Sequence, residues 1–117
     1  MTDQETAAIG ADDAYRQWSQ TLKGSAGAQP TITRTTVNPK TGKRAVRASA
    51  VLTTAEWWEK HSAGAAEVRT LTMREARQSF AEVLDAAEYG GTVTVVTNYG
   101  RPLAAFVPPA LHSAAGK

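Results

Sequence analysis

The strongest pattern of hydrophobic and polar positions lies in the last third of the chain. Apolar residues recur at helical spacing between residues 76 and 87, with charged and polar residues between them. Thr72 and Glu75 have the spacing of a capping box, and Gly90–Gly91 is typical of a helix end. The pattern predicts one helix, whose apolar face is formed by Ala76, Phe80, Val83, Leu84 and Ala87.

A β-hairpin is predicted directly after this helix. Residues 92–97, TVTVVT, are rich in β-branched residues and predict a strand, and residues 98–101 predict a tight turn. Residues 103–107 predict the returning strand, which Pro108 ends because proline has no N–H to donate to a sheet. A further short strand is predicted at residues 67–71, so the whole unit is strand, helix and hairpin.

The first half of the chain has a weaker version of the same pattern. Residues 24–30 interrupt a helical pattern whose apolar positions have the spacing of the later helix. We therefore predict two copies of one unit, and an unrelated N-terminal extension is the alternative. The matching apolar positions are Ala14, Trp18 and Leu22 in the first half and Ala76, Phe80 and Leu84 in the second.

Two helix starts are predicted in the first half from capping residues. Asp12 or Asp13 can cap the first helix with a side-chain oxygen. Thr53 and Glu56 have the spacing of a second capping box. Both predictions depend on local sequence alone.

The two predicted hairpins differ in length. The second turns at Tyr99–Gly100, whereas the first has residues 35–49 between its strands. Asn38–Pro39 and Thr41–Gly42 are turn formers, and the residues on either side can pair. The first hairpin is therefore expected to be longer than the second and to protrude.

Composition and length limit the size of the fold. The chain has 117 residues, of which 42% are hydrophobic and 21% charged. These values suit one domain, or two very small halves that share a core. No apolar run approaches the length of a membrane span, and the first thirteen residues contain acidic side chains without a basic one. We expect no membrane association and no basic targeting segment.

The formal net charge of +2 conceals an uneven distribution. Residues 14–54 contain no Asp or Glu, whereas residues 55–117 carry both signs in similar numbers. A surface of one sign favours a polyanion as partner, either nucleic acid or an acidic protein. A solvated face without a partner is the alternative. The basic residues of this segment are Arg16, Lys23, Arg34, Lys40, Lys43, Arg44 and Arg47.

Catalytic chemistry finds little support in the sequence. The chain has no cysteine, which excludes disulfides, thiol nucleophiles and zinc–thiolate sites and fits a cytoplasmic location. His61 and His112 lack the spacing of a metal site, and there is no glycine-rich phosphate loop. We expect no enzymatic activity, no catalytic residue, no bound metal and no cofactor.

The segment from Leu71 to Val107, LTMREARQSFAEVLDAAEYGGTVTVVTNYGRPLAAFV, resembles the Phd/YefM family of bacterial antitoxins. The similarity lies in the EAR-x-x-F helix, its spacing to the hairpin and the Gly-Arg-Pro turn. The resemblance implies an α+β fold, binding of operator DNA and repression of a toxin–antitoxin operon of bacterial or phage origin. A cognate toxin is a further implied partner, although the family's long C-terminal segment is reduced here to PPALHSAAGK.

The resemblance extends to the first half, where residues 32–34 are similar to a strand of the family and residues 50–60 to a strand that runs into a helix. It also implies a division of the chain. An acidic N-terminal tail at 1–11 precedes a diverged unit at 12–62, followed by a clear unit at 63–108 and a short tail at 109–117. Members of the family form dimers through their sheets, so two units in one chain would form an intrachain pseudo-dimer. A homodimer is the alternative.

Double-stranded DNA is the partner that these observations favour most. NPKTG, in the first hairpin, is also similar to the arm tip of HU-type DNA-bending proteins. Trp57 and Trp58 are candidates for contact with a protein partner, because neighbouring helical residues cannot both face one core. A module that inhibits a toxin or another acidic protein, and an architectural DNA-binding protein with a basic β-arm, are the alternatives. The candidate DNA contacts are Arg34, Lys40, Lys43, Arg44 and Arg47 in the hairpin, with Arg74 and Arg77 on the helix.

Overall fold

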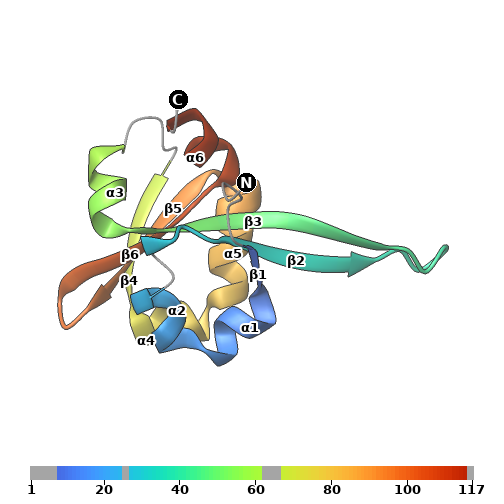
Figure 1. Cartoon of the computed structure of the whole chain (residues 1–117), viewed down its shortest axis with the longest axis horizontal. Coiled ribbons are helices and arrows are strands. Elements are labelled where there is room, and N and C mark those ends of the chain that lie inside the picture. The colour runs from blue at the N-terminus through green and yellow to red at the C-terminus, as the bar shows by residue number, and fades with distance from the viewer. Residues whose placement is uncertain (1–7, 25–26, 62–66, 116–117) are drawn as a thin grey trace.

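The computed structural model describes residues 8–24, 27–61 and 67–115, which form an α+β fold around one six-stranded mixed sheet (Figure 1). The strand order is β1-β2-β3-β6-β5-β4. The strands are β1 (Ala8–Gly10), β2 (Thr31–Val37), β3 (Arg44–Thr54), β4 (Glu67–Thr72), β5 (Thr92–Asn98) and β6 (Arg101–Val107). The helices are α1 (Ala11–Arg16), α2 (Trp18–Gly24), α3 (Ala55–Lys60), α4 (Met73–Gln78), α5 (Phe80–Gly90) and α6 (Pro109–Ala115).

Helices cover both faces of the sheet. In Figure 1, α1, α2 and α4 lie on one side of it and α3 and α6 on the other. The larger core lies on the side of α1, α2 and α4, where α5 also packs against the sheet. In it, alternate residues of the strands contact side chains of α1, α2, α4 and α5. The smaller core lies under α3 and α6, and its buried residues are Trp58, Val93, Ala105 and Val107. No helix in the described ranges has the length and apolarity needed to cross a membrane.

An aromatic cluster joins the two halves of the chain within the larger core. The Trp18 ring from the first half meets Phe80 edge-on at 5.1 Å between centroids, and both contact Phe106. The Trp18 indole N–H donates to the Met73 carbonyl oxygen at 3.0 Å. The apolar positions matched in the sequence are all buried, namely Ala14, Trp18, Leu22, Ala76, Phe80 and Leu84.

The order strand, helix, helix, strand, strand, helix occurs twice along the chain. Both helix pairs are interrupted at the same place, at Gln17 (φ −107°, ψ 42°) and at Ser79 (φ −110°, ψ 28°). Both hairpins also have an irregular register, between Ile32 and Thr33 in β2 and between Val96 and Thr97 in β5. The parallel pairings of β1 with β2 and of β4 with β5 occupy the two edges of the sheet.

The two halves meet at the centre of the sheet, where β3 and β6 pair antiparallel. Leu52 lies opposite Phe106, with Val51 opposite Val107 on one side and Thr53 opposite Ala105 on the other. All six residues are buried. The halves are therefore parts of one sheet with shared cores, and neither has a core of its own.

Local sequence predicted the second half well. The capping box is formed: the Glu75 N–H donates to the Thr72 hydroxyl at 3.1 Å, and the Thr72 N–H donates to the Glu75 carboxylate at 2.9 Å. Gly91 ends the helix with φ 66°, and β6 ends at Val107 before the prolines. The prediction of one unbroken helix was wrong, because the break at Ser79 divides it into α4 and α5.

Both capping predictions for the first half were wrong. Gly10 is the N-cap of α1 and makes no side-chain hydrogen bond, so Asp12 and Asp13 lie in the first turn instead. α3 is capped by Thr54, whose hydroxyl accepts from the Trp57 N–H at 3.0 Å, and not by Thr53. Thr53 is a buried strand residue paired with Ala105, so its side chain belongs to the sheet.

Two segments expected to be tails contribute regular structure. Ala8–Gly10, within the expected tail 1–11, pair with β2 as β1. Pro109–Ala115, within the expected tail 109–117, form α6. Proline is acceptable at the first position of a helix because the backbone N–H there has no partner within the helix. Leu111 packs against the smaller core. Ala11 begins α1, and residues 1–7 and 116–117 lie outside the described residues.

Candidate nucleic-acid interface

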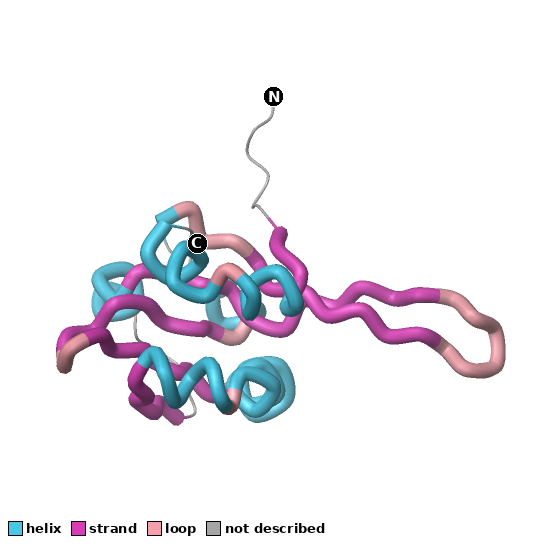
Figure 2. Tube along the Cα trace, turned by 90° about the horizontal axis from the view of Figure 1, so that it is seen from below, coloured by secondary structure: helices cyan, strands magenta, loops and turns pink. Residues whose placement is uncertain are grey.

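The first hairpin protrudes from the body as a two-stranded arm, here defined as residues 35–46 (Figures 1 and 2). β1 pairs with β2 only at residues 31–33, and β6 pairs with β3 only at residues 51–54. Between these ends β2 and β3 pair with each other alone. This confirms a hairpin longer than the β5–β6 hairpin, which turns at Tyr99–Gly100.

Asn38 organises the tip of the arm. Its N–H donates to the Lys43 carbonyl at 2.9 Å, and its side-chain oxygen accepts from the Lys40 N–H at 2.9 Å. Its carbonyl accepts from the N–H of Gly42, where φ of 73° suits glycine. These bonds satisfy the backbone of a turn that has no contact with the body to stabilise it.

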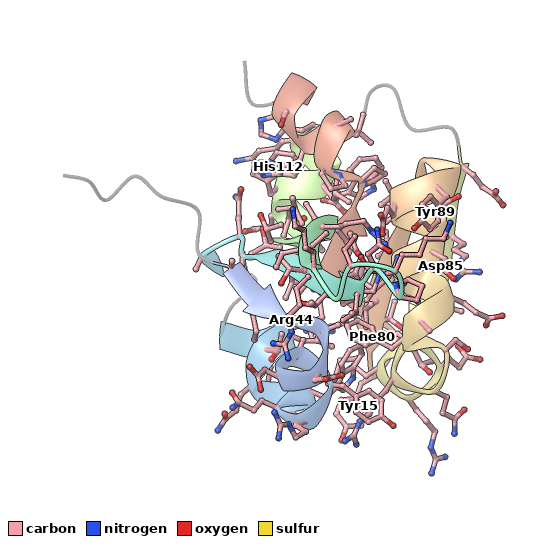
Figure 3. All side chains as sticks on the ribbon, turned by 90° about the vertical axis from the view of Figure 1, so that its right-hand side faces the viewer. Tyr15, Arg44, Phe80, Asp85, Tyr89 and His112 are labelled. Atoms are coloured by element: carbon pink, nitrogen blue, oxygen red, sulfur yellow. The ribbon has the colours of Figure 1, made fainter. Side chains whose placement is uncertain are left out.

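The arm carries exposed positive charge without a carboxylate. Lys40, Lys43 and Arg44 are all exposed, and none takes part in an ion pair among the described residues. Arg44 pairs with Val37 across the arm. Because successive strand residues alternate between faces, Arg44 lies on the face opposite to that of Arg34 and Arg47. In Figure 3, Arg44 lies on one side of the arm, and Asp85 and Tyr89 of α5 lie on the other.

The base of the arm is held to α5 by a compact ionic cluster. The Arg34 guanidinium donates to Glu88 at 2.5 Å, to Asp85 at 2.7 Å and to the Ser49 hydroxyl at 2.7 Å. Arg47 donates to Glu88 at 2.7 Å, and the Ser49 hydroxyl donates to Glu88 at 2.9 Å. One carboxylate thus accepts from three side chains of the first half.

The cluster stabilises the charged form of Glu88. Burial by itself would raise the pKa of Glu88, but the hydrogen bonds from Arg34, Ser49 and Arg47 outweigh it and lower the pKa from 4.5 to about 2. Burial by itself would lower the pKa of Arg34. The hydrogen bonds to Glu88 and Asp85, together with their negative charges, outweigh burial, so the pKa of Arg34 is raised. The arm is therefore fixed at its base by charges that compensate one another.

This cluster separates the predicted DNA contacts into two groups. Arg34 and Arg47 already have carboxylate partners, and Arg47 also lies 5.9 Å from the Tyr89 ring centroid. A phosphate would have to compete with Glu88 for both guanidinium groups. Sequence reasoning placed them with the free cations because their partners come from a helix that lies 41 to 54 residues further along the chain. The residues that remain available on the arm are Lys40, Lys43 and Arg44.

Arg74 and Arg77 are exposed on α4 and are not part of the arm. The Arg77 guanidinium lies 4.7 Å from the Tyr15 ring centroid and donates to the Tyr15 carbonyl at 3.4 Å. Tyr15 also stacks on Phe80 at 6.4 Å (Figure 3). α1, β2, α4 and α5 border an open groove here, lined by Asp12, Arg34 and Arg77 among others. Arg77 thus links α4 to α1.

The two predicted partner-binding tryptophans have different environments. Trp58 is only 6% exposed and belongs to the smaller core, which leaves Trp57 as the tryptophan that can reach a partner. Trp57 is half-buried and stacks between two histidine rings, His61 at 4.4 Å and His112 at 4.8 Å. His112 comes from α6, and its Nε2–H donates to the Gln29 side-chain oxygen at 2.9 Å. This stack joins α6 to α3.

The stack predicts a pH dependence of stability. Burial, and then the charge of His61, lower the pKa of His112 below 6.5, so the folded state disfavours the protonated ring. The folded state therefore has its full stability above pH 6.5, where His112 is neutral in both states. Stability is lost as the pH falls from 6.5 through the lower pKa of His112 in the folded state. We expect His112→Phe, which keeps a stacking ring without a titration, to lose less stability than the parent between neutral and mildly acidic pH. Urea unfolding at both pH values measures this, and equal losses would contradict it.

Asp85, Glu88 and Ser49 are the residues of this region that sequence reasoning missed. Asp85 and Glu88 are spaced for one helix face, but nothing local indicates that this face meets the arm. In the ranges that the structure describes, no three acidic or histidine side chains are grouped to hold a metal ion. Comparison with protein-family models, curated proteins and solved structures found no match for the chain.

Proposed function

We propose that this chain binds double-stranded DNA as a single-chain counterpart of a Phd/YefM-type antitoxin dimer and represses its own toxin–antitoxin operon. The observation that carries the proposal is the protruding arm, whose exposed charges are all positive. Lys40, Lys43 and Arg44 can approach phosphates without neutralisation by a neighbouring carboxylate. A ribbon of two strands fits into a DNA groove.

The pseudo-dimer is supported by the correspondence between the halves. The same element order, the matching helix breaks at Gln17 and Ser79 and the matching strand irregularities are difficult to attribute to an unrelated extension. The β3–β6 pairing centred on Leu52 and Phe106 supports it too, because each strand occupies the same place in its half. A symmetric dimer interface places equivalent residues opposite one another in this way.

The ionic cluster restricts the unpaired positive charge of the first hairpin to the end away from the body. Glu88 and Asp85 neutralise the basic residues at the base and leave the positive charge toward the tip. The charge is thus concentrated where a duplex can reach it, while the base stays attached to α5. The exposed Arg74 on α4 is a second candidate contact on the body.

Toxin neutralisation is the less supported part of the proposal. The C-terminal segment packs on the chain's own sheet as α6, with Leu111 in the smaller core. A segment of seven helical residues is also too short to bury an interface of standard size. A small toxin gene directly downstream of this one would support the antitoxin role, and its absence would leave DNA binding as the part to test.

Salt dependence of DNA binding tests the arm. Each phosphate contact contributes about 0.9 to the slope of log affinity against log salt, because binding releases counterions. Replacing Lys40, Lys43 and Arg44 together with alanine should flatten the slope by roughly two to three. All three side chains are exposed, so the fold should be unaffected. Fluorescence anisotropy with a labelled duplex over a salt series measures the change.

The matched control is Arg101→Ala in the short second hairpin, where Arg101 is exposed as well. One lost contact should change the slope by at most about 0.9. If the triple variant binds as tightly as the parent at every salt concentration, the arm is not the DNA site. The basic arm would then fit an acidic protein partner better, as in the alternative function.

A further inference from the structure

We propose that one copy of this chain binds DNA in a single orientation, so that its preferred sequence is not palindromic. This inference rests on the proposed function, since it concerns how the same surface meets a duplex. A symmetric dimer presents identical side chains to two half-sites and therefore selects a palindrome. The two halves of this chain have the arrangement of such a dimer but no longer the same charges.

The first asymmetry lies at the starts of the two helix pairs. Gly10 and Thr72 are the corresponding N-caps, so counting from them places Asp12 at the position of Arg74. By the same count Tyr15 occupies the position of Arg77. A phosphate that Arg74 attracts in one half would meet a carboxylate in the other half. Two equivalent half-sites therefore cannot be bound equally well.

The neighbourhood of Asp12 strengthens this difference. Asp12 and Asp13 are both exposed in the first turn of α1, and among the residues that the structure describes only Asp13 has an ion-pair partner, Arg16 at 2.5 Å. Glu75, which corresponds to Asp13, uses its carboxylate in the capping box. The first turn of α1 thus carries two carboxylates at the place where α4 carries Arg74.

The second asymmetry is the arm itself. The first hairpin has a tip of six residues, 38–43, and extends beyond the body, whereas the second turns within Tyr99–Gly100. An arm on one half can cover only one flank of a DNA site. The arm belongs to the same half as α1, whose first turn is acidic. On this half, the arm would make the phosphate contacts that the start of α1 cannot make.

The central pairing also removes the need for a second copy. β3 and β6 form the contact by which two units join, and both strands belong to this chain. The chain therefore already contains the two units that a palindrome would require from two molecules. One copy per site is the expected stoichiometry.

The absence of cysteine allows a direct test of orientation. A single cysteine at Thr41→Cys, at the arm tip, or at Tyr99→Cys, at the tip of the other hairpin, can carry an iron chelate that cleaves nearby DNA. The probe is a duplex selected from a random-sequence library by binding to the parent chain. We expect a selected motif that differs from its reverse complement. The chelate at Thr41→Cys should cleave one flank only, and the chelate at Tyr99→Cys should cleave elsewhere.

Several results would overturn the inference and leave DNA binding intact. These are a palindromic motif, cleavage of both flanks from Thr41→Cys, two copies per site in native mass spectrometry, or binding with no selected motif at all. Absence of binding to any duplex in the library would instead reject the proposed function. The two failures are therefore distinguishable.

A charge exchange gives an independent measurement. Asp12→Arg gives the first half an arginine at the position that corresponds to Arg74. The added phosphate contact should steepen the slope of log affinity against log salt by up to about 0.9. It should also increase affinity for a palindrome built from two copies of the Arg74 half-site. Glu82→Arg, which makes the same change of charge at an exposed position of α5, is the control. An unchanged slope and unchanged preference with Asp12→Arg would contradict the inference.

Discussion

Truncating Phe80 to alanine is expected to lower the free energy of unfolding by about 3–5 kcal/mol, and truncating Trp18 by a similar amount. Each ring is 6% exposed, and each contacts the other and Phe106. Loss of either ring removes burial and leaves a cavity between the two halves. The loss is a large part of the stability of a domain of this size.

Urea unfolding of the two variants measures this prediction, with Tyr89→Ala as the control. Tyr89 is 67% exposed and contacts Arg47 across 5.9 Å, so its loss should cost less than about 1 kcal/mol. Because Trp18 and Phe80 are in contact, the double variant should cost less than the sum of the single ones. Separate unfolding transitions for the two halves would contradict a shared core.

Replacing Glu88 with glutamine should cost about 2–3 kcal/mol at neutral pH. Gln keeps the size and one acceptor but removes the charge that binds Arg34 and Arg47. The Glu88 side chain is only 12% exposed and Arg34 20%, so solvent screens this pair weakly, whereas it screens the pair with Arg47, at 36%, more strongly. Glu82→Gln on the same helix is the matched control, since Glu82 is exposed and has no ion pair within the described ranges.

The pH dependence of this effect follows from the lowered pKa. Stability contributed by the Glu88 carboxylate is complete above its ordinary value of 4.5 and is lost as the pH falls toward about 2. The difference between the parent and Glu88→Gln should therefore shrink across this range. Equilibrium unfolding at neutral pH and in acid measures it, and a constant difference would show that Glu88 acts through its shape alone.

Local chemistry made the second half predictable. The Thr72–Glu75 capping box, the positive φ of Gly91 and the Tyr99–Gly100 turn all depend on residues close together in the chain. The arm was predictable for the same reason, since Asn38, Gly42 and their neighbours form the tip without help from the body. The apolar spacing of Ala14, Trp18 and Leu22 also identified buried positions correctly.

Competition between neighbouring residues made other features unpredictable. Thr53 and Thr54 both suit an N-cap, and only the pairing of Thr53 with Ala105 in the sheet leaves Thr54 for α3. The breaks at Gln17 and Ser79 carry no local signal such as proline or glycine. α6 was expected as a tail, because its docking depends on Leu111 reaching a core made by other strands and on the stack of His112 against Trp57.

The sequence by itself determined the capping box at Thr72–Glu75, the two hairpin turns and the buried apolar positions of the helices, and that residues 14–54 carry basic side chains without an acidic one. Only the tertiary structure decided which of those charges remain free. Sheet pairing and helix packing bring Glu88 and Asp85 beside Arg34 and Arg47, while Lys40, Lys43 and Arg44 extend beyond their reach. The physical reason is range: caps and turns depend on bonds between near neighbours, whereas neutralisation of a charge depends on whichever side chain the whole fold places next to it.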